Sequence, residues 1–188
     1  TSLSYKIGSF NLAIFFFTIM SAIFIQIGTN FANDVYDFLK GADNDKRLGP
    51  KRAVQSSLIS VGQMKLFTLV AFFLSVLFGI PLIMKGGTPI LLIGVAGIIS
   101  GYMYTGGPYP LGYNGWGDLF VFIFFGPVAV CGTFYLQSDF ISIHSLIVGI
   151  IMGSLSVCLL CINNIRDAKT DREVGKRTIA VRFSPQYV

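Results

Sequence analysis

The chain has 188 residues, of which 53% are hydrophobic and only 12% charged, against about 25% charged residues in an average soluble domain. This composition argues against a soluble all-α domain with a large core, because long uncharged runs are typical of helices that face lipid. We therefore expect the lipid bilayer as a partner and no nucleic acid, although the formal net charge is +5.

Five apolar segments follow one another along the chain and predict membrane-spanning helices. They run roughly over residues 8–29, 66–84, 89–104, 119–136 and 143–162. Most approach the ~20 residues that a helix needs to cross the hydrocarbon core, and an isolated segment in lipid must satisfy its backbone hydrogen bonds internally. The predicted fold is an all-α, polytopic transmembrane helix bundle, with about five spanning helices in a single domain over residues 1–188.

The basic residues are distributed unevenly among the connections. All of the 14 Lys and Arg residues except Lys6 and Lys85 lie between the first two segments or after the fifth. With five crossings, these two regions share one side of the membrane with the connection after the third segment, and the positive-inside rule makes that side cytoplasmic. One helix more or fewer between the basic regions would split the cations, so the charges support the helix count.

The first apolar segment leads into a cluster of polar side chains at helical spacing. Asn30, Asn33, Asp34 and Asp37 follow an i, i+3, i+4, i+7 pattern. They share one face if the helix continues past the apolar segment. Asp43 follows in the loop.

The fifth segment ends in a matching cluster. Asn163, Asp167 and Asp171 recur at i, i+4 and i+8, so an N-x-x-x-D pattern occurs twice, as Asn33/Asp37 and Asn163/Asp167. Carboxylates one turn apart are hard oxygen ligands that suit Mg²⁺, which shares its other positions with water and phosphate oxygens. Two such helices facing each other predict a site that holds Mg²⁺ and a diphosphate between them.

Basic side chains flank both clusters and are candidates for contacting the remaining phosphate charge. They are Lys46, Arg47, Lys51 and Arg52 in the first loop and Arg166, Arg172, Lys176 and Arg177 after the fifth segment. The alternative interpretation is a pair of solvated loops with salt bridges at helix ends, which accounts for any one acid taken alone. Acids at a helix C-terminus are disfavoured by the helix dipole. Because this unfavourable placement occurs twice, each time with a matching asparagine, a compensating role in a binding site is favoured.

The connection after the third segment is rich in glycine, proline and aromatic residues, and it turns tightly. Its aromatic side chains are Tyr102, Tyr104, Tyr109, Tyr113 and Trp116. An aromatic belt at the membrane interface explains these side chains as well as a role in the site does. If some of them line the site, Tyr104 is the first candidate, and its ring face is suited to stabilising a carbocation.

Several stretches resemble the UbiA superfamily of membrane prenyltransferases. They are residues 33–43 with 47–50, 104–109, 117–126 and 163–178. Within the superfamily, the Lys40-Gly-Ala-Asp43 spacing and the Gly-Lys-Arg-Thr178 ending resemble the 1,4-dihydroxy-2-naphthoate polyprenyltransferase branch of menaquinone synthesis. The resemblance begins at the second family helix and stops after the sixth. It therefore implies part of a nine-helix bundle, and we expect the domain to be incomplete at both ends.

The resemblance also implies an activity and a location. The activity is Mg²⁺-dependent transfer of a polyprenyl group from polyprenyl diphosphate to an aromatic acceptor. The implied acceptor is 1,4-dihydroxy-2-naphthoate, which loses CO₂ to give demethylmenaquinone. The implied location is a bacterial plasma membrane, with the charged loops on the cytoplasmic side.

Site residues follow from the same resemblance together with the spacing. The expected metal ligands are Asn33, Asp34, Asp37, Asp43, Asp167 and Asp171. The expected catalytic residues are Asp37, Asp167, Asp171 and Tyr104. The expected diphosphate-binding residues are Asn33, Asn163, Lys46, Arg47, Arg52, Arg166, Lys176 and Arg177.

Other functions stay open at this stage. One alternative is prenyl transfer to another acceptor, such as 4-hydroxybenzoate, homogentisate or haem, as in other branches of the superfamily. A divalent-cation transporter is an alternative from a different class, because acids in spanning helices often mark ion paths. Against it, every acidic residue except Asp139 gathers on one face. A non-catalytic protein that keeps the fold is a third alternative, and the intact motifs argue against it.

Overall fold

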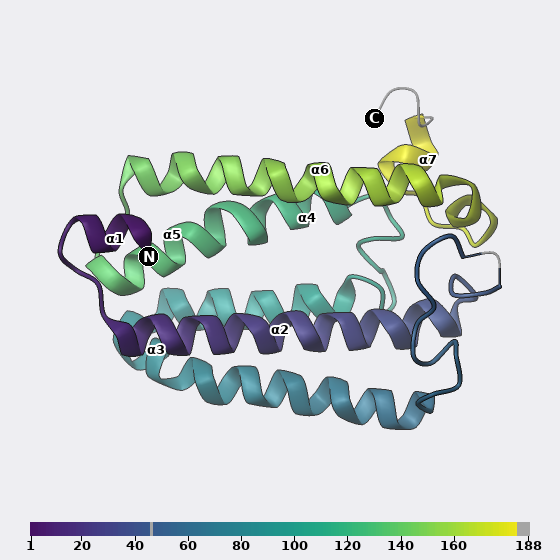
Figure 1. Cartoon of the computed structure of the whole chain (residues 1–188), viewed down its shortest axis with the longest axis horizontal. Helices are drawn as coiled ribbons and strands as arrows, with labels where there is room; N and C mark the ends of the chain where they lie inside the picture. Colours follow the sequence, from purple (N-terminus) through teal and green to yellow (C-terminus); the bar gives the residue numbers. More distant parts are fainter. Residues whose placement is uncertain (46, 184–188) are drawn as a thin grey trace.

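The computed structural model of the chain describes residues 1–45 and 47–183, and over these residues it contains helices and no β-strand. The elements are α1 (Ser2–Lys6), α2 (Leu12–Leu39), α3 (Val61–Met103), α4 (Gly117–Ile123), the π-helical segment η1 (Phe124–Val128), α5 (Ala129–Ser138), α6 (Ile143–Glu173) and α7 (Ile179–Phe183) (Figure 1). The predicted all-α class is confirmed.

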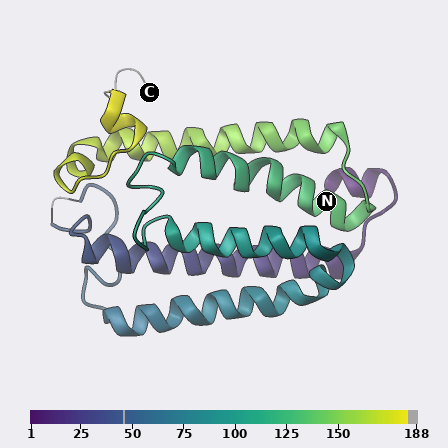
Figure 2. The same ribbon diagram turned by 180° about the vertical axis from the view of Figure 1, so that it is seen from behind.

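Helix α3 crosses the bundle twice, because its chain reverses direction at Gly87. The φ angle of Gly87 is 67°, a value that favours glycine, and Pro89 follows two residues later. Figures 1 and 2 show the two halves of α3 running antiparallel. Four helical stretches are long and apolar enough to cross a membrane. The reversal inside α3 turns them into the five passes that the apolar segments predict.

Both helices that carry the polar clusters continue well past their apolar segments. Helix α2 ends at Leu39 and α6 at Glu173, so each cluster lies on the last turns of a continuous helix. Capping boxes, in which Ser60 pairs with Gln63 and Ser142 with Ser145, mark where α3 and α6 begin. The helical spacing predicted for both clusters is therefore confirmed.

Three loops meet at one end of the bundle. They are the first loop (residues 40–45 and 47–60), the middle loop (104–116) and the loop after α6 (174–178), and they lie at the right-hand end of Figure 1 and the left-hand end of Figure 2. At the opposite end, the ammonium of Lys85 pairs with both carboxylate oxygens of Asp139, at 2.7 and 2.8 Å. The concentration of charged residues on one face, expected from the five crossings, is present in the structure.

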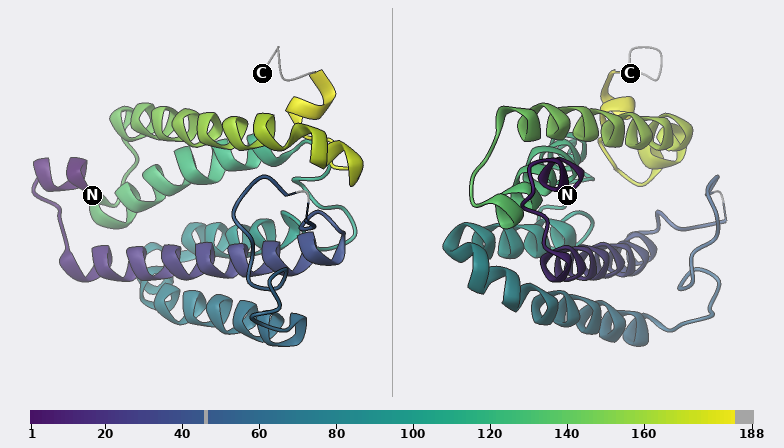
Figure 3. Two further views of the ribbon diagram at one scale, coloured as in Figure 1. Left: turned by 45° about the vertical axis from the view of Figure 1, so that its right-hand side comes forward. Right: turned by 60° about the vertical axis from the view of Figure 1, so that its left-hand side comes forward.

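The helices pack as two groups that are joined through α5. Helix α2 packs along α3, and α6 packs against α4 and η1, while α5 contacts α2 and α3 as well as α6 (Figure 3). The buried apolar side chains form separate clusters, one at the loop end and one near the reversal of α3. They are Val35, Val54 and Met64 in the first cluster and Leu82, Ile90 and Leu136 in the second.

Large apolar side chains cover the outside of the bundle. Leu12 on α2 is 68% exposed, Leu92 on α3 is 62% exposed, and Leu159 on α6 is 66% exposed. Such a surface is unfavourable in water but matches the hydrocarbon core of a bilayer. With the apolar helices of sufficient length, this surface indicates a multi-pass membrane protein.

Segment η1 packs closely against α6, where glycines face one another. A Cβ atom on Gly126 would lie 2.6 Å from the carbonyl oxygen of Gly149 and 2.8 Å from the Cα atom of Gly153. Both neighbours are backbone atoms that cannot move aside as a flexible side chain can. Small residues let helix backbones approach in membranes, where lipid provides little hydrophobic drive for association.

We expect Gly126→Ala to destabilise the protein, because its methyl group would force η1 away from α6. Overpacking of this kind costs about 1–3 kcal/mol, which would lower the midpoint of thermal unfolding in detergent. Gly94→Ala on α3 is the matched control, because a Cβ atom there meets nothing within 4 Å. Equal unfolding midpoints for the two variants would contradict the packing described here.

Candidate functional site

Carboxylates from both polar clusters meet at the loop end of the bundle. The ammonium of Lys176 lies 3.5 Å from Oδ1 of Asp37 on α2 and 3.7 Å from Oδ1 of Asp171 on α6. Asp37 is 2% exposed and Asp171 is 8% exposed. One cation therefore contacts buried acids from both clusters, which lie more than 130 residues apart in the sequence.

Asn33 and Asp34, near the end of α2, have different partners. Asp34 accepts the backbone N–H groups of Ala53 and Val54, at 3.1 and 3.3 Å. This carboxylate therefore holds the first loop against α2. The amide oxygen of Asn33 accepts a hydrogen bond of 2.8 Å from the hydroxyl of Thr105, which ties α2 to the middle loop.

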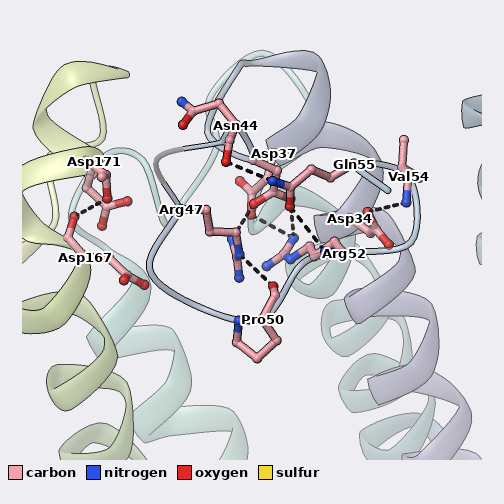
Figure 4. Close-up of polar contacts among 12 residues, drawn as sticks. Asp34, Asp37, Asn44, Arg47, Pro50, Arg52, Val54, Gln55, Asp167 and Asp171 are labelled. Carbon is pink, nitrogen blue, oxygen red and sulfur yellow. Dashed lines mark hydrogen bonds and ion pairs between the residues drawn. The ribbon is translucent and has the colours of Figure 1, made fainter. Parts of the chain in front are cut away.

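Asp37 and Asp43 share the guanidinium of Arg52. Its Nη1 atom lies 3.0 Å from Oδ2 of Asp37 and 3.4 Å from Oδ2 of Asp43, and Arg47 donates to the other oxygen of Asp43. Figure 4 shows Arg47 and Arg52 gathered beside the end of α2, opposite the carboxylates of α6. Burial raises the pKa of Asp43, and the positive charge of Arg52 acts in the opposite direction. The loop arginines thus compensate a cluster of buried negative charge.

The acids on α6 differ in their surroundings. Asp167 is paired with the adjacent Arg166, at 2.8 and 2.7 Å, while Asp171 is buried and faces Lys176. Figure 4 shows both acids on α6. Asn163, one turn before Asp167, is exposed. Among the residues that the structure describes, the contacts joining the two clusters run through Lys176, and neither Asn163 nor the exposed Arg177 takes part in them.

Two guanidinium groups border Gly49 in the first loop. A Cβ atom on this glycine would lie 3.3 Å from Nη2 of Arg166 and 3.4 Å from Nη2 of Arg47. The loop thereby brings Arg47 close to α6, although these residues are far apart in sequence. Such a gathering of like charges favours binding of an anion. Lys46, predicted to contribute to the same charge, lies outside the described residues.

The aromatic side chains of the middle loop fall into two groups. Tyr109 is 51% exposed and Trp116 is 47% exposed. Tyr102, which is also exposed, hydrogen-bonds with Tyr36. These side chains are placed as an interfacial belt would be.

Tyr104 and Tyr113 point inward instead. The Tyr104 hydroxyl would be 2.8 Å from a Cβ atom on Gly117, so the glycine leaves room for it. Burial raises the pKa of Tyr104, and the negative charges of Asp118, Asp37 and Asp171 raise it further. Tyr104 is therefore a neutral phenol close to the acids of the site.

Sequence reasoning assigned no specific role to three residues that lie among the acids of the candidate site. The hydroxyl of Tyr113 donates to Oδ1 of Asp37 at 2.8 Å, and Lys40 donates to the carbonyl oxygen of Thr105. Lys40 follows Asp37 by three residues and stands in the Lys40-Gly-Ala-Asp43 spacing. Tyr113 was one of five aromatic candidates and Thr105 was not a candidate, because a loop has no periodicity that predicts the direction of a side chain.

We expect Arg52→Gln to destabilise the protein, because it leaves Asp37 and Asp43 without their shared cation. Arg52 is 26% exposed, so the loss should be about 1–3 kcal/mol, below the full value for a buried pair. Lys65→Gln, at an exposed cation on the same side of the bundle, is the matched control.

The destabilisation should depend on pH in a defined direction. Burial raises the folded-state pKa of Asp43 above its ordinary 3.8, so the folded protein binds this proton more readily than the unfolded chain. The contribution of Asp43 to stability therefore falls as the pH rises through the folded pKa. Without Arg52 this effect grows, so the deficit of Arg52→Gln should shrink from about pH 8 to about pH 5 in thermal unfolding with EDTA. A deficit that grows on acidification would contradict this account.

Comparison with known proteins places the chain in a family. The model of the UbiA prenyltransferase family matches residues 3–188. The 1,4-dihydroxy-2-naphthoate octaprenyltransferase of Haemophilus influenzae is 37% identical over 93% of this chain, that of Mycobacterium tuberculosis 39% over 86%, and that of Escherichia coli 36% over 97%. The chain spans 58%, 55% and 61% of these proteins, respectively. The chain therefore belongs to the UbiA prenyltransferase family.

Proposed function

We propose that the protein transfers a polyprenyl group from polyprenyl diphosphate to an aromatic acceptor, 1,4-dihydroxy-2-naphthoate, with loss of CO₂, giving demethylmenaquinone in its reduced, quinol form. The observation that carries this proposal is the contact of Lys176 with both Asp37 and Asp171. It brings acids and cations from two distant clusters to one end of the bundle. The family and the names of the three relatives supply the reaction class and the acceptor.

The oxygen donors of the site fit Mg²⁺, the proposed cofactor. Among the described residues, no group of three or more His, Cys, Asp or Glu side chains is arranged to enclose a metal ion. Mg²⁺ needs less, because it binds through one or two carboxylates and completes its shell with water and phosphate oxygens. Oδ2 of Asp43 is buried and accepts no hydrogen bond from the described residues, and Nη1 of Arg52 lies 3.4 Å from it, so this oxygen faces a cation that a metal ion can replace.

The proposed metal ligands remain Asn33, Asp34, Asp37, Asp43, Asp167 and Asp171. Asp37, Asp167 and Asp171 are the strongest of these, because each faces a cation that a metal ion can replace. Asp34 is the weakest, because it accepts two backbone N–H groups. When bound, Mg²⁺ would supply positive charge to the phosphate oxygens and favour departure of the diphosphate.

Basic side chains of the chain bind the diphosphate in this proposal. Arg47, Arg52, Arg166 and Lys176 already lie around the acids. Asn163, Lys46 and Arg177 stay proposed contributors on the strength of the motif alone. These cations compensate the negative charge that develops on the leaving diphosphate, which is the largest electrostatic demand of the reaction.

The proposed reaction breaks the bond between the allylic carbon and its oxygen, and both electrons leave with the diphosphate. The acceptor ring then forms a bond to the allylic carbon. Loss of CO₂ returns an electron pair to the ring. Tyr104, neutral and close to the acids, presents an aromatic face that stabilises the developing cation.

The proposed location is the plasma membrane of a bacterium, with the three site loops on the cytoplasmic side. The distribution of the basic residues supports this orientation through the positive-inside rule.

Removing either bridging carboxylate should abolish the activity of the full protein. We expect Asp37→Asn and Asp171→Asn each to lower prenyl transfer at least about a hundredfold, since each removes charge that acts on the diphosphate–metal complex. Asp139→Asn, at the opposite end of the bundle, should retain activity. The measurement is product formation by the purified protein in detergent with Mg²⁺. Full activity in either site variant would refute the metal assignment.

The acceptor is tested separately with a panel of aromatic compounds. We expect transfer to 1,4-dihydroxy-2-naphthoate, with one CO₂ released for each product, and little transfer to 4-hydroxybenzoate or homogentisate. A preference for another member of the panel would keep the prenyl transfer and overturn the acceptor.

A further inference from the structure

Tyr113 lies at the centre of the site although it belongs to neither aspartate cluster. It is 8% exposed, and backbone hydrogen bonds hold both Tyr113 and the preceding Gly112. The N–H of Arg177 donates to the carbonyl oxygen of Tyr113 at 2.8 Å, and the N–H of Gly112 donates to that of Tyr104 at 2.9 Å. The middle loop and the segment after α6 thus fix the position of this ring.

The hydroxyl of Tyr113 is directed at the acid that joins the two clusters. It donates to Oδ1 of Asp37 at 2.8 Å, and the same oxygen is approached by Lys176. The other oxygen of Asp37 faces Arg52. Both carboxylate oxygens are therefore held, and the phenol determines the orientation of one of them.

The ring of Tyr113 is in contact with two ammonium groups. Lys40 Nζ lies 4.4 Å from the ring centroid and Lys176 Nζ lies 4.9 Å from it, both within the range of cation–π attraction. The side chains come from the end of α2 and from the segment after α6. Lys40 also donates to the carbonyl oxygen of Thr105. A single ring thus holds in place two flexible cations that would otherwise repel each other.

We propose that Tyr113 is a positioning residue of the diphosphate site, whose hydroxyl orients Asp37 and whose ring holds Lys40 and Lys176 for contact with the diphosphate. This inference rests on the proposed function, since it takes the diphosphate as the anion that the site receives. It adds Lys40 to the residues that contact the diphosphate. It also assigns two roles to Tyr113, one to its hydroxyl and one to its ring.

The two tasks predict different effects for two variants. Tyr113→Phe keeps the ring and removes the hydroxyl, so the affinity for diphosphate should stay within about threefold of the unchanged protein. Its kcat for prenyl transfer should fall roughly tenfold or more, because Asp37 loses a hydrogen bond to its charged group. Tyr113→Leu removes both features and should also weaken diphosphate binding by roughly tenfold or more.

The experiment measures binding of inorganic diphosphate to the full protein in detergent by isothermal titration calorimetry, at one fixed Mg²⁺ concentration, beside the kinetics of prenyl transfer. Tyr109→Leu, at an exposed tyrosine of the same loop, is the control and should leave both quantities unchanged. Lys40→Met should weaken binding as Tyr113→Leu does. Combining Tyr113→Leu with Lys40→Met should reduce the binding free energy by less than the sum of the two single losses, because the ring and the ammonium act together.

The outcomes separate the inference from the proposed function. No binding of diphosphate by the unchanged protein would refute the proposed function. If the unchanged protein binds diphosphate and both Tyr113→Leu and Lys40→Met bind it with the same affinity, the positioning role is refuted and the proposed function is not. If Tyr113→Leu does not fold, Lys40→Met tests the contact with the ring and Tyr113→Phe tests the role of the hydroxyl. A kcat of Tyr113→Phe equal to that of the unchanged protein would overturn the role of the hydroxyl.

Discussion

The ammonium of Lys176 between the carboxylates of Asp37 and Asp171 is the contact on which the site depends. Buried carboxylates are unfavourable unless cations or hydrogen bonds compensate them. Here the compensation is supplied across chain segments, because Arg52 comes from the first loop and Tyr113 from the middle loop. Each loop is therefore bound to the helix ends by the charges it neutralises. Since the acids hold the cations in place, guanidinium and ammonium groups are gathered at this end of the bundle.

This contact is possible only because the chain crosses the bundle five times. The reversal at Gly87 gives α3 two antiparallel halves and brings the middle loop back to the end where α2 finishes. Without that reversal, Asp171 would lie at the opposite end from Asp37. The backbone angle of one glycine, in a region that side chains rarely adopt, thus decides on which side of the membrane the second cluster lies. The close packing of Gly126 against α6 then holds the helix of that cluster against its neighbours.

Residue spacing predicted the two helical clusters of the candidate site, and the limits of that prediction have physical causes. The period of a helix predicted that Asn33 and Asp37 share a face, because side chains one turn apart must do so. The same argument covered Asp167 and Asp171. It did not reveal that Asp34 would hold the first loop through two backbone N–H groups, since that partner is chosen by the path of the loop. Nor did it identify Tyr113, whose direction is set by hydrogen bonds to residues more than sixty positions away.

The sequence by itself determined the helical class, the number of passes and the end of the bundle where charge gathers. These follow from the length of apolar segments and from the alternation of sides at each crossing, both of which are local or additive properties. Only the tertiary structure decided which cations meet which acids and which tyrosines turn inward. Those choices depend on the paths of three loops, where glycine and proline leave several backbone conformations open and distant contacts select one of them.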